Sequence, residues 1–126
     1  MEDIRKTLER FIEAFNGLRL EDMMKEFSED ATSFFPITHH LVRLMGREEI
    51  MAAFQKVIDK MKAAGLNKLS MVVEDLDIRD YGDVAVATFH IRDNMLSRRT
   101  LVLSKVDDRW LITHLHASNA PLEGGE

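Results

Sequence analysis

Histidine and arginine side chains in the second half of the sequence are the residues whose types and spacing could support chemistry. His90 and Arg92 alternate along an apolar, β-branched run, so they share one face of the strand predicted there, and Asp93 falls on the opposite face. Because His90 and Asp93 face opposite sides of the strand, proton transfer between them is disfavoured, since it requires the two groups to come within hydrogen-bond reach. Arg98 and Arg99 are adjacent and face opposite ways in a strand, so one of them could reach the protein interior. The candidate catalytic residues are His90, Arg92 and Arg99, with a solvated rim of charges as the alternative interpretation.

His114 and His116 have metal-ligand spacing, because residues two apart on a strand point to the same face. No acidic residue stands beside them in the last apolar run, and the sequence holds no His-Glu-x-x-His pattern. We therefore predict no metal site and no cofactor. The same alternation places Trp110 and Ile112 on the face of the two histidines, and amphipathic aromatic groups are favoured at protein interfaces. From this face we predict a homodimer with an interface of Val102, Val106, Trp110, Ile112, His114 and His116.

The composition indicates one domain without cysteine chemistry. The chain has 126 residues, of which 45% are hydrophobic, which is enough for a core without a metal or disulfides. It contains no cysteine, which excludes a thiol nucleophile and fits a reducing cytoplasm. The formal net charge of −5 argues against a nucleic-acid partner. The charged first residues are not followed by an apolar run, so we expect no signal peptide, no membrane partner and a cytoplasmic location.

Hydrophobic periodicity changes from helical to alternating about half-way along the chain. Apolar residues at helical spacing predict helices over 2–16, 20–28 and 47–64. β-Branched and apolar runs predict strands over 31–36, 39–44, 69–79, 83–94, 98–106 and 110–118. Helices followed by a meander of strands indicate an α+β fold, with the helices against one face of a mostly antiparallel sheet. We expect one domain over residues 1–120 and a frayed tail over 121–126.

Two segments carry a resemblance to a known superfamily. The first runs from Glu29 through Asp30-Ala31-Thr32 to Pro36 and is followed by Gly46-Arg47-Glu48-Glu49-Ile50, which resembles a pattern of ketosteroid isomerases and SnoaL-like proteins. The second runs from Trp110 to Pro121 and is similar to the final strand of kinase association domains. The chain thus resembles the nuclear-transport-factor-2-like superfamily, in its SnoaL-like and kinase association-domain-like branch. The resemblance implies a cone-shaped α+β fold, in which a curved six-stranded sheet packs on three helices from the N-terminal half.

The resemblance also bears on an enzyme function. It implies an acidic base in the first strand and a tyrosine in the first helix, which remove a proton beside a carbonyl and stabilise the enolate. The matching positions here are Phe35 and Phe11, and phenylalanine can neither accept a proton nor donate a hydrogen bond. Ketosteroid-isomerase chemistry is therefore not expected in its known form. Two pocket arginines of the kinase association domains fall on Leu101 and Ala117, so their anion clamp is not expected either.

What remains is a cone lined by aromatic and apolar side chains, which is either a filled core or a ligand cavity. The predicted lining consists of Phe11, Phe15, Phe35, Leu101, Leu115 and Ala117. Three functions stay open. The chain could bind a small apolar molecule in the cone, serve as a homo-oligomerisation module without catalysis, or be an isomerase-, cyclase- or dehydratase-like enzyme with an atypical active site.

Overall fold

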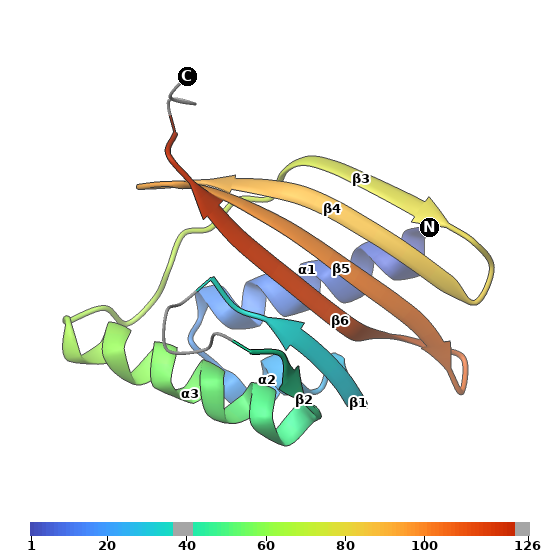
Figure 1. Cartoon of the computed structure of the whole chain (residues 1–126), viewed down its shortest axis with the longest axis horizontal. Helices are drawn as coiled ribbons and strands as arrows, with labels where there is room; N and C mark the ends of the chain where they lie inside the picture. Colours follow the sequence, from blue (N-terminus) through green and yellow to red (C-terminus); the bar gives the residue numbers. More distant parts are fainter. Residues whose placement is uncertain (37–41, 123–126) are drawn as a thin grey trace.

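A computed structural model describes residues 1–36 and 42–122, and Figure 1 shows a curved sheet with helices against one face. The helices are α1 (Glu2–Asn16), α2 (Leu20–Met24) and α3 (Arg47–Ala63). The strands are β1 (Phe27–Phe34), β2 (Leu44–Met45), β3 (Glu74–Asp80), β4 (Val84–Arg92), β5 (Leu96–Val106) and β6 (Arg109–Ala120). This architecture confirms the predicted α+β fold of a six-stranded sheet on helices from the N-terminal half. Within the described ranges, none of the helices combines the length and the apolar character that crossing a membrane requires.

The sheet has the strand order β2-β1-β6-β5-β4-β3. Neighbouring strands pair antiparallel except β1 and β6, which are parallel, so the prediction of a mostly antiparallel sheet is confirmed. A two-residue turn of Asp107 and Asp108 joins β5 to β6, and both residues have positive φ, at 50° and 64°. This turn matches the right-handed twist of the long strands that it connects.

Several element boundaries differ from the sequence prediction. β1 begins at Phe27, inside the range predicted as helix 20–28, because β1 pairs with β6 from that residue onward. The predicted strand 69–79 forms a strand only from Glu74, since residues 69–71 are tied to the end of α1 instead. Residues 39–41 of the predicted strand 39–44 lie outside the described residues, as do residues 123–126 of the predicted tail. Of the described residues 42–44, only Leu44 is in a strand, as the first residue of β2.

The core lies between the inner face of the sheet, which faces the helices, and the apolar stripe of α1. Ile4, Leu8 and Phe11 on that stripe are at most 2% exposed. Phe11 lies at the centre of an aromatic cluster, with its ring centroid 5.4 Å from that of Phe27 and 6.2 Å from that of Phe54. Burial of each such side chain contributes about 1.5–3 kcal/mol, so this cluster fixes α1 and α3 against β1.

A bulge in β6 overturns part of the predicted dimer interface. Val102 of β5 pairs with His114, whereas the next residue, Leu103, pairs with Ile112, so one extra residue is inserted into β6 at position 113. The insertion reverses the alternation of side chains along the strand. Trp110 and Ile112 therefore point to the helices and are 8% and 0% exposed, while His114 and His116 point to the outer face. The prediction that these four residues share one exposed face is wrong.

Candidate functional site

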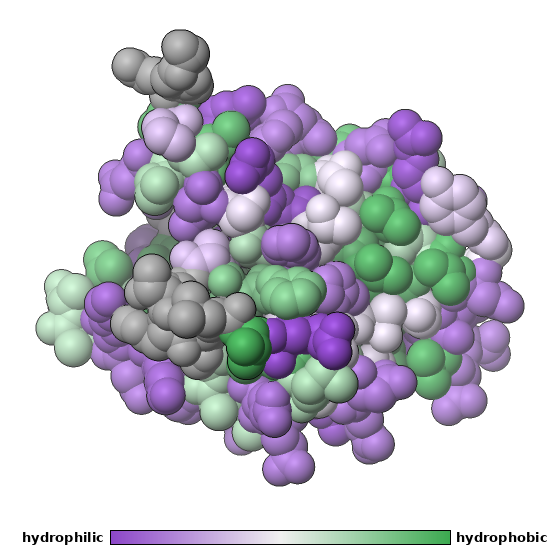
Figure 2. Space-filling model, in the orientation of Figure 1, coloured by the Kyte–Doolittle hydropathy of each residue, from purple (hydrophilic) through white to green (hydrophobic). Residues whose placement is uncertain are grey.

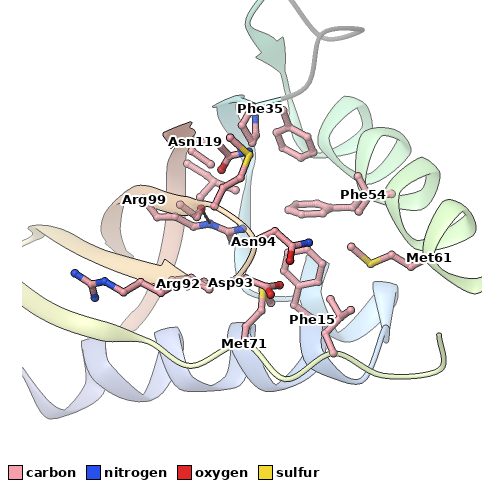
Figure 3. Close-up of a pocket in the computed structure, with 18 of the residues that line it drawn as sticks. Phe15, Phe35, Phe54, Met61, Met71, Arg92, Asp93, Asn94, Arg99 and Asn119 are labelled. Atoms are coloured by element: carbon pink, nitrogen blue, oxygen red, sulfur yellow. Dashed lines mark hydrogen bonds between the residues drawn. The ribbon is translucent and has the colours of Figure 1, made fainter. Parts of the chain in front are cut away.

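A cavity of about 430 Å³ opens between the inner face of the sheet and the helices α1 and α3. Figure 3 shows Phe54 and Met61 projecting from α3 on one side of the cavity, with Arg99 of β5 and Asn119 of β6 on the opposite side. The volume lies within the range of sites that bind small molecules. The lining includes Phe15, Phe35, Pro36, Phe54, Val57, Met61, Leu69, Ser70, Met71, Ile91, Arg92, Asp93, Asn94, Met95, Ser97, Arg99, Leu115, Ala117 and Asn119.

The aromatic wall of the cavity is built around Phe54, which projects from the middle of α3. Its ring centroid lies 4.8 Å from that of Phe35 and 5.3 Å from that of Phe15. Both pairs are steeply inclined, which is a favourable arrangement for aromatic rings. α3 can hold this position because Gly46, before its first residue, adopts a φ of 92° that other residues rarely take.

A second wall is formed by residues 69–71, which Asn16 holds in place. The side-chain amide of Asn16 donates to the carbonyl of Met71 at 3.0 Å, and its amide oxygen accepts from the Met71 N–H at 2.9 Å. The Leu69 N–H donates to the Asn16 carbonyl at 2.7 Å. The sequence analysis placed Asn16 only at the end of the helix predicted over 2–16, and no local sequence pattern indicates its contacts with residues 69–71.

Four of the six predicted lining residues contact the cavity: Phe15, Phe35, Leu115 and Ala117. Phe11 and Leu101 do not, because both are 0% exposed within the packed core below it. The prediction missed α3, although its spacing of Phe54, Val57 and Met61 was visible, because such a stripe is more often core. It also missed the turn between β4 and β5, which contributes Asp93 and Asn94.

Arg99 is the cationic group that extends into the cavity from β5. It pairs with Phe89 and Ala117 across the sheet, so it points to the inner face. Its Nε donates to Ser97 Oγ at 3.0 Å, and its guanidinium carbon lies 5.9 Å from the centre of the Phe15 ring. Burial among these groups lowers the pKa of Arg99 to about 10, which still leaves the guanidinium charged at neutral pH.

The structure separates the other two candidate catalytic residues from Arg99. His90 points to the outer face, where its Nδ1 lies 2.9 Å from Asp75 Oδ2. In Figure 3 the Arg92 guanidinium points away from the cavity, and its Nη1 donates to Glu74 Oε1 and Asp75 Oδ2 at 2.9 Å each. The hydrogen bond from His90, and then that from Arg92, lower the pKa of the Asp75 carboxyl. These residues form a partly exposed ion-pair network rather than one site with Arg99.

Asp75 itself was not identified from the sequence. It lies at an irregularity in the pairing of β3 with β4 and has a φ of 56°. Such a backbone conformation is uncommon for residues other than glycine, asparagine and aspartate. Because the irregularity changes the register, strand alternation alone could not place Asp75 beside His90.

The two histidines of β6 lie on the outer face of the sheet. His114 Nδ1 is hydrogen-bonded to Thr32 Oγ1 at 2.8 Å, and the ring centroids of His114 and His116 are 6.4 Å apart. Burial, followed by the charges of His116 and Arg43, lowers the pKa of His114. In the part of the chain that the structure describes, no group of three or more histidine, aspartate or glutamate side chains is placed to hold a metal ion.

Comparison with protein families identifies the fold to which this cavity belongs. Residues 4–123 match the SnoaL-like domain. The chain belongs to the SnoaL-like family. None of the curated proteins matches the sequence. The SnoaL-like assignment confirms the resemblance that the segments around Asp30 and Trp110 indicated.

Solved structures confirm the nuclear-transport-factor-2-like fold of this SnoaL-like chain. A protein of that fold and unknown function from Pseudomonas putida KT2440 has a TM-score of 0.80 at 18% identity, covering 93% of this chain and 84% of that chain. A proposed dehydratase from Streptomyces avermitilis has a TM-score of 0.79 at 17% identity, covering 94% of each chain. A proposed calcium/calmodulin-dependent protein kinase type II association domain from Thiobacillus denitrificans ATCC 25259 has a TM-score of 0.74 at 20% identity, covering 90% of this chain and 92% of that chain. At these identities the likeness concerns the fold alone.

Proposed function

We propose that this SnoaL-like protein binds a small, largely apolar molecule in the cavity between α1, α3 and the sheet. The observation that carries the proposal is the contrast between two ends of the same aromatic cluster. Phe11 and Phe27 are 0% exposed and completely packed, whereas Phe15, Phe35 and Phe54 line a space of about 430 Å³. A mainly apolar concave site with a few polar groups is typical of small-molecule binding.

Two methionines of α3 allow a matched test of the proposal. Met61 lines the cavity, and Met51 is 38% exposed elsewhere on the same helix. Met61→Trp is expected to fill part of the cavity, whereas Met51→Trp adds the same ring outside it. We expect the neutral apolar dye Nile red to bind the wild-type protein and Met51→Trp with similar affinity. Binding to Met61→Trp should be about tenfold weaker, the loss of roughly 1.4 kcal/mol of contacts.

Native mass spectrometry of the purified protein provides a second readout. A small-molecule adduct that is present in the wild-type protein and Met51→Trp, and reduced in Met61→Trp, would support the proposal. Nile red binding that is equal in all three proteins would contradict it, provided that circular dichroism shows all three to be folded. The comparison of the two methionine variants separates loss of the cavity from a general effect of an added tryptophan.

Homodimerisation through the outer face of the sheet is a second candidate function. Figure 2 views the sheet from the side opposite α1 and shows hydrophobic side chains gathered over its right half. We call this group the valine patch; it consists of Val84, Val86, Val102, Val106 and Leu111. Val86 and Val102 are direct cross-strand partners, and Val84 and Val106 are each 42% exposed. Contiguous exposed apolar surface of this kind usually marks an interaction site.

The valine patch replaces the interface predicted from sequence, retaining Val102 and Val106 but not Trp110 or Ile112. A second copy is the occupant we propose, because a twofold axis sets one patch against itself. The Thiobacillus protein of the same fold is described as an association domain, which agrees with this proposal. Sedimentation equilibrium should give a dimer at tens of micromolar, and Val102→Glu should give a monomer. A wild-type monomer at that concentration would contradict the proposal.

A further inference from the structure

We infer that the molecule bound in the cavity is a monocarboxylic acid with an aromatic or alicyclic body, and that its carboxylate pairs with Arg99. This inference rests on the proposed binding function and adds the chemical class of the ligand.

Arg99 differs from the other arginines because it is shielded from solvent and has no acidic partner among the described residues. Arg10, Arg19, Arg47, Arg79 and Arg92 each form an ion pair with aspartate or glutamate. Arg5, Arg43, Arg98 and Arg109 are exposed, so water solvates them. Over residues 1–36 and 42–122, no carboxylate lies within ion-pairing distance of Arg99, although it is largely shielded from solvent. A shielded charge without a partner is costly, so a ligand that supplies the counter-charge would be strongly favoured.

Among the described residues, Arg99 donates a hydrogen bond only through Nε, which leaves its two terminal nitrogens for a ligand. Ser97 Oγ accepts from Nε at 3.0 Å and so fixes the plane of the guanidinium. Figure 3 shows the guanidinium extending into the cavity, beside Asn94. Two parallel N–H groups of a guanidinium match the two oxygens of a carboxylate, and such charge-assisted pairs are about twice as strong as neutral hydrogen bonds.

The charges of the cavity favour a monoanion over a phosphate or a dicarboxylate. Among the described residues that line the cavity, Arg99 is the cation that faces it, since the Arg92 guanidinium points away and is paired with Glu74 and Asp75. The Asp93 carboxylate also lines the cavity and would repel additional negative charge. Arg99 can pair with one carboxylate, and a second negative charge on the ligand would meet the repulsion of Asp93 without a cation of its own.

The remaining wall favours a flat or cyclic apolar body. The rings of Phe15, Phe35 and Phe54 form one side, and a ring at 4.5–7 Å from such groups gains from inclined aromatic packing. Met61, Met71 and Met95 complete the lining, and flexible thioether side chains adapt to the outline of an apolar ligand. A ligand with a carboxylate at one end and a ring at the other satisfies both parts of the site.

Isothermal titration calorimetry with hydrocinnamate and its neutral amide, hydrocinnamamide, tests the inference. The two probes share the same ring and chain and differ in the charge of the head group. We expect the wild-type protein to bind the acid about 10- to 100-fold more tightly than the amide, which corresponds to hydrogen bonds to a charged group. Arg99→Gln should abolish this preference while leaving binding of the amide within about threefold, so that amide binding also shows that the cavity is intact.

Arg98→Gln is the matched control, because Arg98 carries the same charge in the same strand but faces outward and donates to Ser118 Oγ at 3.2 Å. It should retain the preference for the acid. Arg99→Lys should bind the acid with intermediate affinity, since it keeps the charge but not the paired donors.

The outcomes distinguish this inference from the binding function beneath it. If acid and amide bind the wild-type protein equally, or if Arg98→Gln loses the preference as much as Arg99→Gln, the inference is overturned while the binding function stands. It is also overturned if Nile red binds and hydrocinnamate does not. If neither probe nor Nile red binds, both the inference and the proposed function fail.

Discussion

Arg98 and Arg99 are adjacent residues of β5 that lie in opposite environments. Arg98 is exposed on the outer face beside Ser118, whereas Arg99 lies on the inner face against Phe15 and Ser97. The same difference separates the two faces of the whole sheet: the outer face has solvated ion pairs and a valine patch, and the inner face has a packed core and a cavity. Residue type alone thus does not mark the site. What marks it is a charge that the fold shields and that no carboxylate of the described residues pairs with.

The largest expected effect is a loss of stability, and it tests which side chains of β6 lie on the inner face of the sheet. Trp110→Ala should lower the free energy of unfolding by about 3–5 kcal/mol, because Trp110 is 8% exposed and its removal leaves a cavity in the core. His116→Ala, on the outer face, should change it by less than about 0.5 kcal/mol. Urea unfolding followed by circular dichroism measures both values. If Trp110→Ala lowers the free energy of unfolding by less than about 1 kcal/mol and dissociates a dimer, Trp110 lies on the outer face and the present assignment is wrong.

A smaller effect of opposite sign is expected for Arg99. Arg99→Met should raise the free energy of unfolding of the ligand-free protein by about 1 kcal/mol, because it removes a shielded charge that no carboxylate of the described residues neutralises. Arg98→Met should stay within about 0.5 kcal/mol of the wild type, since Arg98 is exposed. Urea unfolding after extensive dialysis is the measurement. A clear loss of stability in Arg99→Met would indicate that Arg99 serves the fold rather than a ligand.

The pH dependence of stability tests the outer face at His114. Its pKa is lowered from 6.5 in the folded protein, mainly by burial and then by the charges of His116 and Arg43. Below about pH 6.5 the unfolded chain therefore takes up a proton that the folded protein does not, and stability falls until the pH passes below the folded pKa. We expect a small loss between about pH 7 and pH 5 that is reduced in His114→Asn. Identical pH profiles of the two proteins in urea unfolding would contradict this assignment.

No effect is expected in an isomerase assay. Phe35, on the cavity wall, and Phe11, in the core, occupy the positions that the resemblance assigns to an acidic base and a tyrosine. The protein should not move the double bond of a cyclic enone faster than acetate at the same concentration, as followed by ultraviolet absorbance. Turnover well above that rate, abolished by a change within the cavity, would show that the inner face carries proton-transfer chemistry after all.

The sequence predicted the fold better than it predicted the site. The helical spacing of α1 and α3 and the alternation in β4 and β5 are local patterns, so the elements and their order followed from them. The bulge at residue 113 is set by pairing with Val102 and Leu103 across the sheet, and nothing in β6 itself indicates it. Alternation therefore placed Trp110 and Ile112 on the wrong face.

The sequence also did not indicate how deep within the cone each residue lies. Phe11 and Phe15 are one helical turn apart on α1, yet Phe11 is covered by Phe27 and Phe54 while Phe15 reaches the cavity. Arg99 was a candidate because adjacent residues of a strand face opposite ways, so either it or Arg98 had to point inward. That no carboxylate of the described residues pairs with Arg99 depends on which acids the fold brings near. Such properties come from contacts between distant segments, and a single sequence does not display them.

Nuclear magnetic resonance provides the most direct test of the claim that the cavity, rather than the outer face, binds the ligand. In a titration of the isotopically labelled protein with hydrocinnamate, we expect changes in chemical shift at the Arg99 Nε–H and at the amides of Asn94, Ser97 and Asn119, all of which line the cavity. The resonances of the Arg98 side-chain Nε–H and of Val102, both on the outer face, should stay in place. Shifts confined to the outer face, or no shift at Arg99 when the probe is bound, would contradict this account of the molecule.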